Sequence, residues 1–207
     1  MKKLLVLLFS VFFLLSSPSV FADDISDFQI EGISIGDSLL DYMTEDEILK
    51  EIEHTKNYYS YLKEPNKYAE VYLFNDFLTY KDGLSFFVKN NPTSQYITDK
   101  NEKYIILSIR GMLSFNEDFE GCIQKRDEIV EELSKVFPNA EIQKFDYISR
   151  SEPSGESVFD DVDLLFDSGK IKAQCNNWKE TYRLKNNFIE GLSISIDTKE
   201  TTLWLKN

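Results

Sequence analysis

The chain has two cysteines, Cys122 and Cys175, and a single histidine, His54. A Cys-x-x-Cys motif is absent and His54 lies in a distant polar segment, so neither thiol has the neighbours that usually activate a redox or nucleophilic cysteine. Cys122 falls on the apolar stripe of a predicted helix, and Cys175 falls on the apolar positions of a predicted strand. Because both side chains then point inward, we predict a structural Cys122–Cys175 disulfide, which is typical of an oxidising compartment.

Acidic residues crowd one predicted hairpin, between residues 152 and 167. Its carboxylates are those of Glu152, Glu156, Asp160, Asp161, Asp163 and Asp167. Alternation along a strand places Asp161, Asp163 and Asp167 on one face, and Asp160 points to the other. The run lacks the spacing of an EF-hand calcium loop, so we predict a charged, solvated face that discourages edge pairing. A cation site made by Asp161, Asp163 and Asp167 is the alternative, and no cofactor is predicted.

Tyrosines gather between residues 57 and 72, at positions Tyr58, Tyr59, Tyr61 and Tyr68. Pro65 prevents a single helix from turning all of these rings toward one buried stripe. Tyrosine can stay partly exposed and still anchor a partner, so we predict that these four residues contact a protein, a peptide or a small ligand. The alternative is that the rings belong to strands and to the core.

Catalytic signatures are missing from the sequence. It has no Gly-x-Ser-x-Gly motif, phosphate loop or dinucleotide fingerprint, and a Ser-His-Asp triad would have to recruit His54. The formal net charge of −13 argues against nucleic acid as a partner, because phosphate binding needs clustered Lys and Arg. These observations favour a non-enzymatic binding or interaction module. A hydrolase that uses paired carboxylates, or a structural or stress-related envelope protein, stays as the alternative.

Residues 1–22 have the pattern of a secretory signal peptide. Lys2 and Lys3 precede an apolar run, and Ala22 ends a stretch with small residues at the two positions that a signal peptidase reads. We therefore predict cleavage near Ala22-Asp23 and a soluble periplasmic or secreted protein. Later apolar runs are too short to cross a bilayer.

Residues 116–137 predict a long helix, with Asn116 as its N-cap and Pro138 as its stop. Before it, residues 28–35 predict a short strand broken at Gly32, and Thr44 and Glu47 form a capping box at the start of a helix over 44–54. Strands are predicted at 69–75, 84–90, 104–115, 140–149, 157–166, 170–177, 189–197 and 201–206.

This order of elements predicts an α+β fold, in which an antiparallel sheet packs against the long helix 116–137. A smaller helix-plus-hairpin portion precedes it. We predict one domain over residues 23–207, with a possible N-terminal lobe over 23–100.

The signal peptide followed by DFQIEGISIGDSLLDYMTEDEI resembles the opening of uncharacterised exported proteins from AT-rich marine alphaproteobacteria. The likeness covers about the first 50 residues and depends on the segment from Glu31 to Ser38. It implies a Gram-negative envelope location, the periplasm, and it implies neither an activity nor any site residue.

Overall fold

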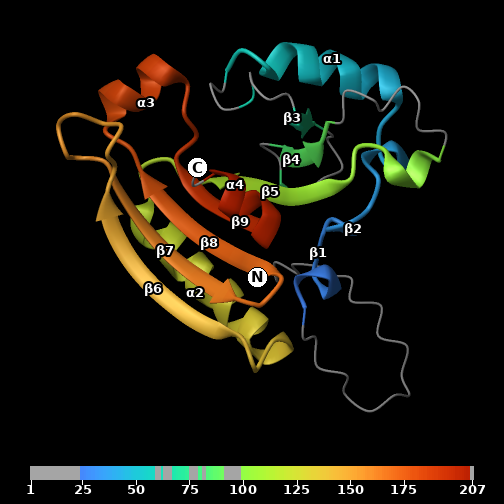
Figure 1. Ribbon diagram of the computed structural model, residues 1–207. Coiled ribbons are helices and arrows are strands. Elements are labelled where there is room, and N and C mark those ends of the chain that lie inside the picture. Colours follow the sequence, from blue (N-terminus) through green and yellow to red (C-terminus); the bar gives the residue numbers. More distant parts are fainter. Residues whose placement is uncertain are drawn as a thin grey trace, which may run out of the picture.

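A computed structural model of the protein describes residues 24–58, 62, 67–74, 79–80, 83–90 and 99–205. The predicted signal peptide and its cleavage point lie outside these residues. The fold is α+β, as predicted, with a two-stranded hairpin, a seven-stranded antiparallel sheet and four α-helices among the described residues. Figure 1 shows α2 on one side of the sheet and α1 beside its β3–β4 end.

The large sheet has the strand order β3-β4-β5-β9-β8-β7-β6, and every neighbouring pair is antiparallel. Its strands are β3 (Tyr68–Leu73), β4 (Leu84–Lys89), β5 (Ile106–Ser114), β6 (Glu141–Ile148), β7 (Val158–Leu165), β8 (Gly169–Asn177) and β9 (Gly191–Thr198). A strand was predicted from the sequence at each of these seven places. The pairing of β5 with β9 joins the N-terminal hairpin β3–β4 to the C-terminal meander in one sheet.

Helix α2 (Phe119–Val136) lies against β8 and β9. The prediction of Asn116 as its N-cap is wrong, because the side chain of Asp118 accepts the hydrogen bond from the Gly121 amide at 2.9 Å. A Cβ at Gly121 would lie 2.2 Å from the Asp118 carboxylate, so a side chain there would push this carboxylate out of its present position. The next residue, Cys122, forms the predicted disulfide with Cys175 of β8, with their Cα atoms 6.0 Å apart.

The N-terminal portion is built as the sequence predicts. The strand broken at Gly32 is the tight hairpin of β1 (Gln29–Ile30) and β2 (Ile33–Ser34). Helix α1 (Glu45–Thr55) begins with the predicted capping box, in which the Thr44 amide donates to Glu47 at 2.9 Å. Helix α1 packs against β3, the first strand of the sheet.

The prediction of a strand at 201–206 is wrong, because this segment is helix α4 (Lys199–Leu205). The Thr198 hydroxyl accepts from the Thr201 amide at 3.2 Å and begins the turn. Trp204 then packs on Tyr68 and Phe87, with ring centroids 4.7 and 5.5 Å away. The short helix α3 (Glu180–Asn186) was not predicted either, so the sheet carries more than the single long helix expected.

Side chains alternate between the two faces of the sheet. On β9, Leu192, Ile194 and Ile196 point toward α2 and belong to the main buried cluster, together with both cysteines. Ser193, Ser195 and Asp197 point the other way. We call this second face, away from α2, the polar face.

Candidate binding surface

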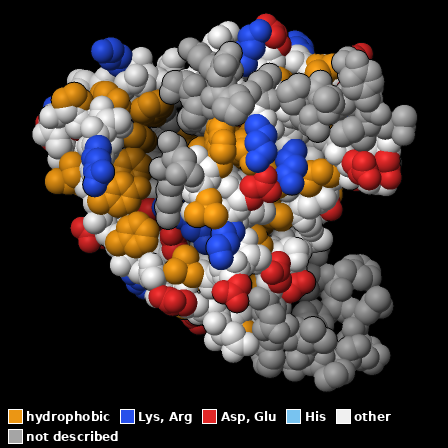
Figure 2. All heavy atoms as spheres, viewed as in Figure 1, with side chains coloured by type: hydrophobic (Ala, Val, Ile, Leu, Met, Phe, Trp, Pro, Cys, Tyr) orange, Lys and Arg blue, Asp and Glu red, His pale blue; other side chains and the backbone are white. Residues whose placement is uncertain are grey.

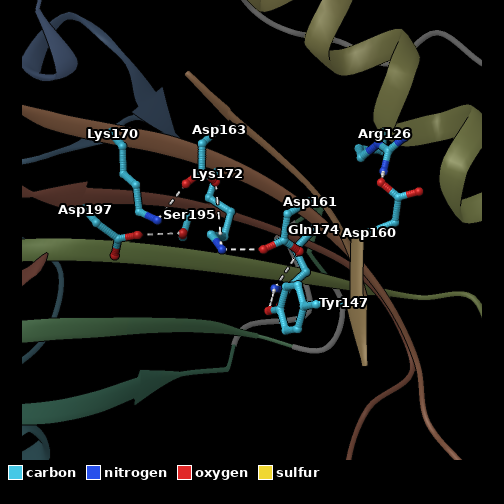
Figure 3. Close-up of polar contacts among 10 residues, drawn as sticks. All are labelled: Arg126, Tyr147, Asp160, Asp161, Asp163, Lys170, Lys172, Gln174, Ser195 and Asp197. Carbon is cyan, nitrogen blue, oxygen red and sulfur yellow. Dashed lines mark hydrogen bonds and ion pairs between the residues drawn. The ribbon is translucent and has the colours of Figure 1, made fainter. Parts of the chain in front are cut away.

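Two buried carboxylates of β7 lie in the middle of the polar face. Asp161 is 0% exposed and Asp163 is 5% exposed, and each is neutralised by a lysine of the neighbouring strand β8. Lys172 contacts Asp161, and Lys170 donates to Asp163 at 2.8 Å, while a second oxygen of Asp163 lies 3.8 Å from Lys172 (Figure 3). The result is a charge-balanced network across two strands.

Gln174 connects this network to an aromatic side chain. Its amide nitrogen donates to Asp161 at 2.8 Å and to the hydroxyl of Tyr147 on β6 at 3.1 Å. Burial lowers the pKa of Lys172, but the hydrogen bond and charge of Asp161 outweigh it, so this pKa is raised and the lysine stays protonated. Burial and the nearby Asp161 also raise the pKa of Tyr147, which keeps its proton at neutral pH.

The sequence-based prediction of a solvated acidic face is therefore wrong for Asp161 and Asp163. The predicted assignment of the aspartates to the two faces of the strand is right, because Asp160 points to the opposite face. That Asp161 and Asp163 are buried and have lysine partners was not predicted from the sequence. Asp167 is exposed, outside the strands. Lys170 and Lys172 occupy the positions beside the carboxylates where a cation would bind, and within the described ranges no group of three or more potential ligands is placed to hold a metal.

On the other face, Asp160 pairs with Arg126 of α2, which also contacts Asp127 at 2.9 Å. The Arg126 side chain is buried although it is charged. It lies four residues after Cys122 and four before Val130, so it fills a gap in the apolar stripe of the helix. A charged residue on the apolar stripe of a helix and an aspartate on the inward face of a strand could have predicted this ion pair from the sequence.

A small hollow opens beside the network, over β3, β4, β5 and β9. It is lined by Glu70, Ser85, Phe87, Ser108, Arg110, Asp197, Thr201 and Leu205. Asp197 accepts from the hydroxyls of Ser108 at 2.6 Å and Ser195 at 2.9 Å. The volume of about 70 Å³ has room for only a few water molecules, so this hollow does not fit a metabolite.

Aromatic rings form a continuous surface from β6 to α3. We call Phe145, Tyr147, Phe159, Trp178, Tyr182 and Phe188 the aromatic cluster. Tyr147 stacks on Phe159 at 5.2 Å between centroids, Phe159 meets the edge of Trp178 at 4.9 Å, and Trp178 lies 4.7 Å from Phe188. Figure 2 shows hydrophobic side chains gathered on the side of the molecule where β6 and α3 lie.

The α3 end of this cluster is poorly covered. None of the seven residues of α3 is buried, and Leu184 is 61% exposed and Phe188 39% exposed. A helix this short is marginal on its own, so its contacts with the body hold it in place. Tyr182 provides two of them, a ring contact with Trp178 and a hydroxyl that donates to the Ser151 carbonyl at 2.8 Å.

The predicted tyrosine surface is not formed as expected. Tyr68 is buried, packs against Phe87 and Trp204, and donates to Glu200 at 2.7 Å, so its assignment as a contact residue is wrong. Tyr58 is exposed and contacts the ring of His54 at 5.0 Å. Tyr59 and Tyr61 lie outside the described residues.

The loop between β6 and β7 is organised around a buried carboxylate, that of Glu152. It accepts hydrogen bonds from the Ser154 amide at 2.7 Å, the Glu156 amide at 3.0 Å and the Ser157 amide at 3.3 Å. Desolvation alone would raise the pKa of Glu152, but these donors prevail and lower it to about 2. The loop therefore depends on the ionised form of this side chain.

We expect Glu152→Gln to lower the melting temperature at pH 7 by a few degrees, because an amide cannot accept all of these bonds. A carboxyl with a depressed folded-state pKa stabilises the fold above its unfolded value of about 4.5, and this contribution disappears as the pH falls through about 2. The difference between wild type and variant should thus shrink between pH 5 and about pH 2. Thermal melts of both proteins, with Glu132→Gln on the exposed side of α2 as control, measure this. A difference that stays constant over this range would contradict the assignment.

A comparison with protein-family models, curated protein sequences and solved structures finds no match to this chain. Over the described part of the chain, no helix is both long and apolar enough to span a membrane. The aromatic cluster escaped sequence analysis because its rings come from four separate segments. Phe145 and Tyr147 alternate on one strand and Trp178 and Tyr182 have helical spacing, but only the β6–β7 register brings Phe159 between them.

Proposed function

We propose that this protein is an exported, non-enzymatic binding module that holds a protein partner against its aromatic cluster. The exposed α3 end of the cluster carries the proposal, because Leu184 lies on a helix that buries none of its own side chains and Phe188 follows just after that helix. Apolar surface of this kind is typical of interaction sites, and aromatic anchors supply much of the binding free energy in protein interfaces.

The surroundings of the cluster favour a polypeptide over a sugar. Exposed aliphatic side chains, Ile148 on β6 and Leu184 on α3, flank the rings. They offer apolar contact to side chains of a partner but no hydrogen bonds to hydroxyl groups. The polar groups nearest the rings, Gln174 and Asp161, are already engaged with one another.

The disulfide and the signal-peptide pattern support export to an oxidising compartment, for which we propose the periplasm. The buried carboxylates give little support to the alternative of a carboxylate-based hydrolase. Asp161 and Asp163 each have a lysine partner, whereas a general acid needs a carboxyl group that stays protonated near neutral pH.

The binding proposal predicts the behaviour of the double variant Leu184→Ser with Phe188→Ser. Peptides selected on the wild-type protein from a displayed library of random dodecapeptides should bind the variant at least about tenfold more weakly, because truncating exposed anchors removes about 1.4 kcal/mol or more. Fluorescence anisotropy with the selected peptides measures the dissociation constants. Leu49→Ser with Phe74→Ser removes the same residue types from exposed positions far from the cluster and should leave binding unchanged.

Selected peptides that bind both double variants equally would place the interaction elsewhere. A library that yields no binder, together with specific binding on an oligosaccharide array, would overturn the choice of a polypeptide partner. Circular dichroism melts of the variants show whether each is folded. Since the substituted residues are exposed, we expect melting temperatures close to that of the wild type.

A further inference from the structure

Strand β6 is an open edge of the sheet. It is the terminal strand in the order, it pairs with β7 without a register shift, and all eight of its residues are exposed. The opposite edge is covered, because α1 packs on β3 and the Thr55 hydroxyl donates to the Glu70 carbonyl at 2.6 Å. Natural proteins usually protect edges with bulges, prolines, short strands or charged side chains. Strand β6 has only the last of these, at Glu141, Lys144 and Asp146.

The free backbone groups of β6 can be assigned from the β6–β7 pairing. The Ser149 amide, directly after β6, donates to the Ser157 carbonyl at 2.8 Å, so the backbone of residue 149 points toward the β7 side. Backbone direction alternates along an antiparallel strand, so residues 147, 145, 143 and 141 also point inward. The N–H and C=O groups of Ile142, Lys144, Asp146 and Ile148 therefore point to the open edge.

We propose that the partner of this edge is a second copy of the same chain, paired antiparallel through β6 with a two-fold axis at Phe145. In this register Lys144 lies opposite Asp146 of the second copy, and Asp146 lies opposite its Lys144. Ile142 and Ile148 pair in the same reciprocal way. These four residues are the ones with free backbone groups, so each pair exchanges two main-chain hydrogen bonds across the two-fold axis.

The charges select this register over its neighbours. Main-chain hydrogen bonds form only if residues whose backbone groups point to the open edge lie opposite one another. The two-fold axis must therefore pass through a residue of β6, and neighbouring registers differ by moving the axis one residue along the strand. An axis at residue 144 sets Lys144 against Lys144, and an axis at residue 146 sets Asp146 against Asp146, both of which are unfavourable. Only the axis at Phe145 places opposite charges together while keeping all four outward residues paired.

The same register covers exposed apolar side chains. Ile142 is 44%, Phe145 40%, Tyr147 40% and Ile148 57% exposed in the single chain. On the polar face the two Phe145 rings meet at the axis, where directly opposed aromatic residues stabilise a strand pair. One strand pair buries less than a standard protein interface, so the dimer should be a weak one that forms at micromolar or higher concentration.

This self-association covers Phe145, Tyr147 and Ile148 of the proposed partner surface, but not the residues changed in the peptide-binding test. It uses the edge of β6, whereas Leu184 and Phe188 belong to the α3 end of the cluster. The Leu184→Ser, Phe188→Ser variant should therefore dimerise like the wild type. The dimer is tested by changes in β6 and the peptide binding by changes at the α3 end, so failure of one proposal can be told from failure of the other.

Charge reversal tests the dimer directly, by sedimentation equilibrium over a range of protein concentrations. Lys144→Glu alone sets glutamate against Asp146, and Asp146→Lys alone sets lysine against Lys144, so each variant should be monomeric where the wild type is dimeric. An equimolar mixture of the two variants restores opposite charges at both positions and should form heterodimers. The doubly substituted chain, Lys144→Glu with Asp146→Lys, should dimerise with itself.

Cysteine trapping tests the register. Directly opposed residues without mutual hydrogen bonds have Cα atoms about 4.5 Å apart, within the range of a disulfide, so Phe145→Cys should give a cross-linked dimer on mild oxidation. Gln143→Cys is the matched control, because its two copies would lie about 13 Å apart along the strands. A wild-type chain that stays monomeric at millimolar concentration, charge variants that fail to complement each other, or equal cross-linking at both positions would overturn the proposal.

Discussion

Removal of the Cys122–Cys175 disulfide is expected to lower the free energy of unfolding by roughly 4 kcal/mol. The bond joins residues 53 positions apart, and closing a loop of this length reduces the conformational entropy of the unfolded chain by about that amount in the chain-entropy model. The bond also ties α2 to β8, so we expect α2 to be the helix that loosens first.

Urea unfolding of Cys122→Ala with Cys175→Ala, and of the wild type with reductant, measures the effect. Both cysteine side chains are fully buried, so alanine avoids placing new hydroxyl groups in the core. The reduced wild type keeps the sulfur atoms and therefore separates the loss of the cross-link from the loss of packing. A fall below about 1 kcal/mol in the reduced wild type would contradict the entropic account. Amide exchange in α2, compared with exchange in the distant hairpin β3–β4, shows where the loosening begins.

The disulfide could be predicted because it depends on two local patterns. Cys122 lies on the apolar stripe of α2, and Cys175 alternates with polar residues on β8. Both patterns point to one core, and no third cysteine competes. The same reasoning located the other strands of the sheet and the capping box of α1. These features could be predicted from the sequence because each depends on a local, periodic pattern of residues.

The helix ends and the last element show why other predictions failed. Asn116 and Asp118 are both good capping residues, and the choice between them depends on Glu117, which has a φ of 61° and turns the chain just before α2. Residues 201–206 have strand-forming composition, but β9 already has β5 and β8 on its two sides. The segment instead folds over the polar face as α4, where Trp204 covers Tyr68 and Phe87.

The candidate surface was the hardest part to predict, because register between strands decides it. The alternation of Asp161 and Asp163 on β7, and of Lys170 and Lys172 on β8, is plain in the sequence. Whether they meet depends on the β7–β8 pairing, which sets Asp163 opposite Lys172. When the β7–β8 register is unknown, the lysine partners of these aspartates are unknown too, and a row of acidic residues is interpreted as a solvated surface. The burial of Tyr68 depends in the same way on Trp204, which is far away in the chain.

Substitution of Lys172 by methionine is expected to lower the free energy of unfolding by about 3–5 kcal/mol, the typical cost of breaking a buried ion pair by removing one partner. Asp161 is 0% exposed, and Lys172 is its ion-pair partner among the described residues, so without Lys172 its charge stays buried and without a counter-charge. Methionine has nearly the length of the lysine stem, so lost packing contributes little. Lys135→Met is the matched control, because Lys135 is bonded to Glu131 at 2.7 Å on the exposed surface of α2. Its loss should cost less than about 1 kcal/mol.

The double variant Lys172→Met with Asp161→Leu distinguishes the value of the ion pair from the cost of an isolated charge. Removing both partners leaves no unpaired carboxylate, so we expect this variant to regain most of the stability lost in Lys172→Met. The coupling free energy from the four-protein cycle, measured by urea unfolding, should then be large and favourable. If Lys172→Met is no less stable than Lys135→Met, Asp161 reaches water when its lysine is gone. The buried network would then be an easily hydrated part of the polar face and not a fixed support beneath Tyr147 and the aromatic cluster.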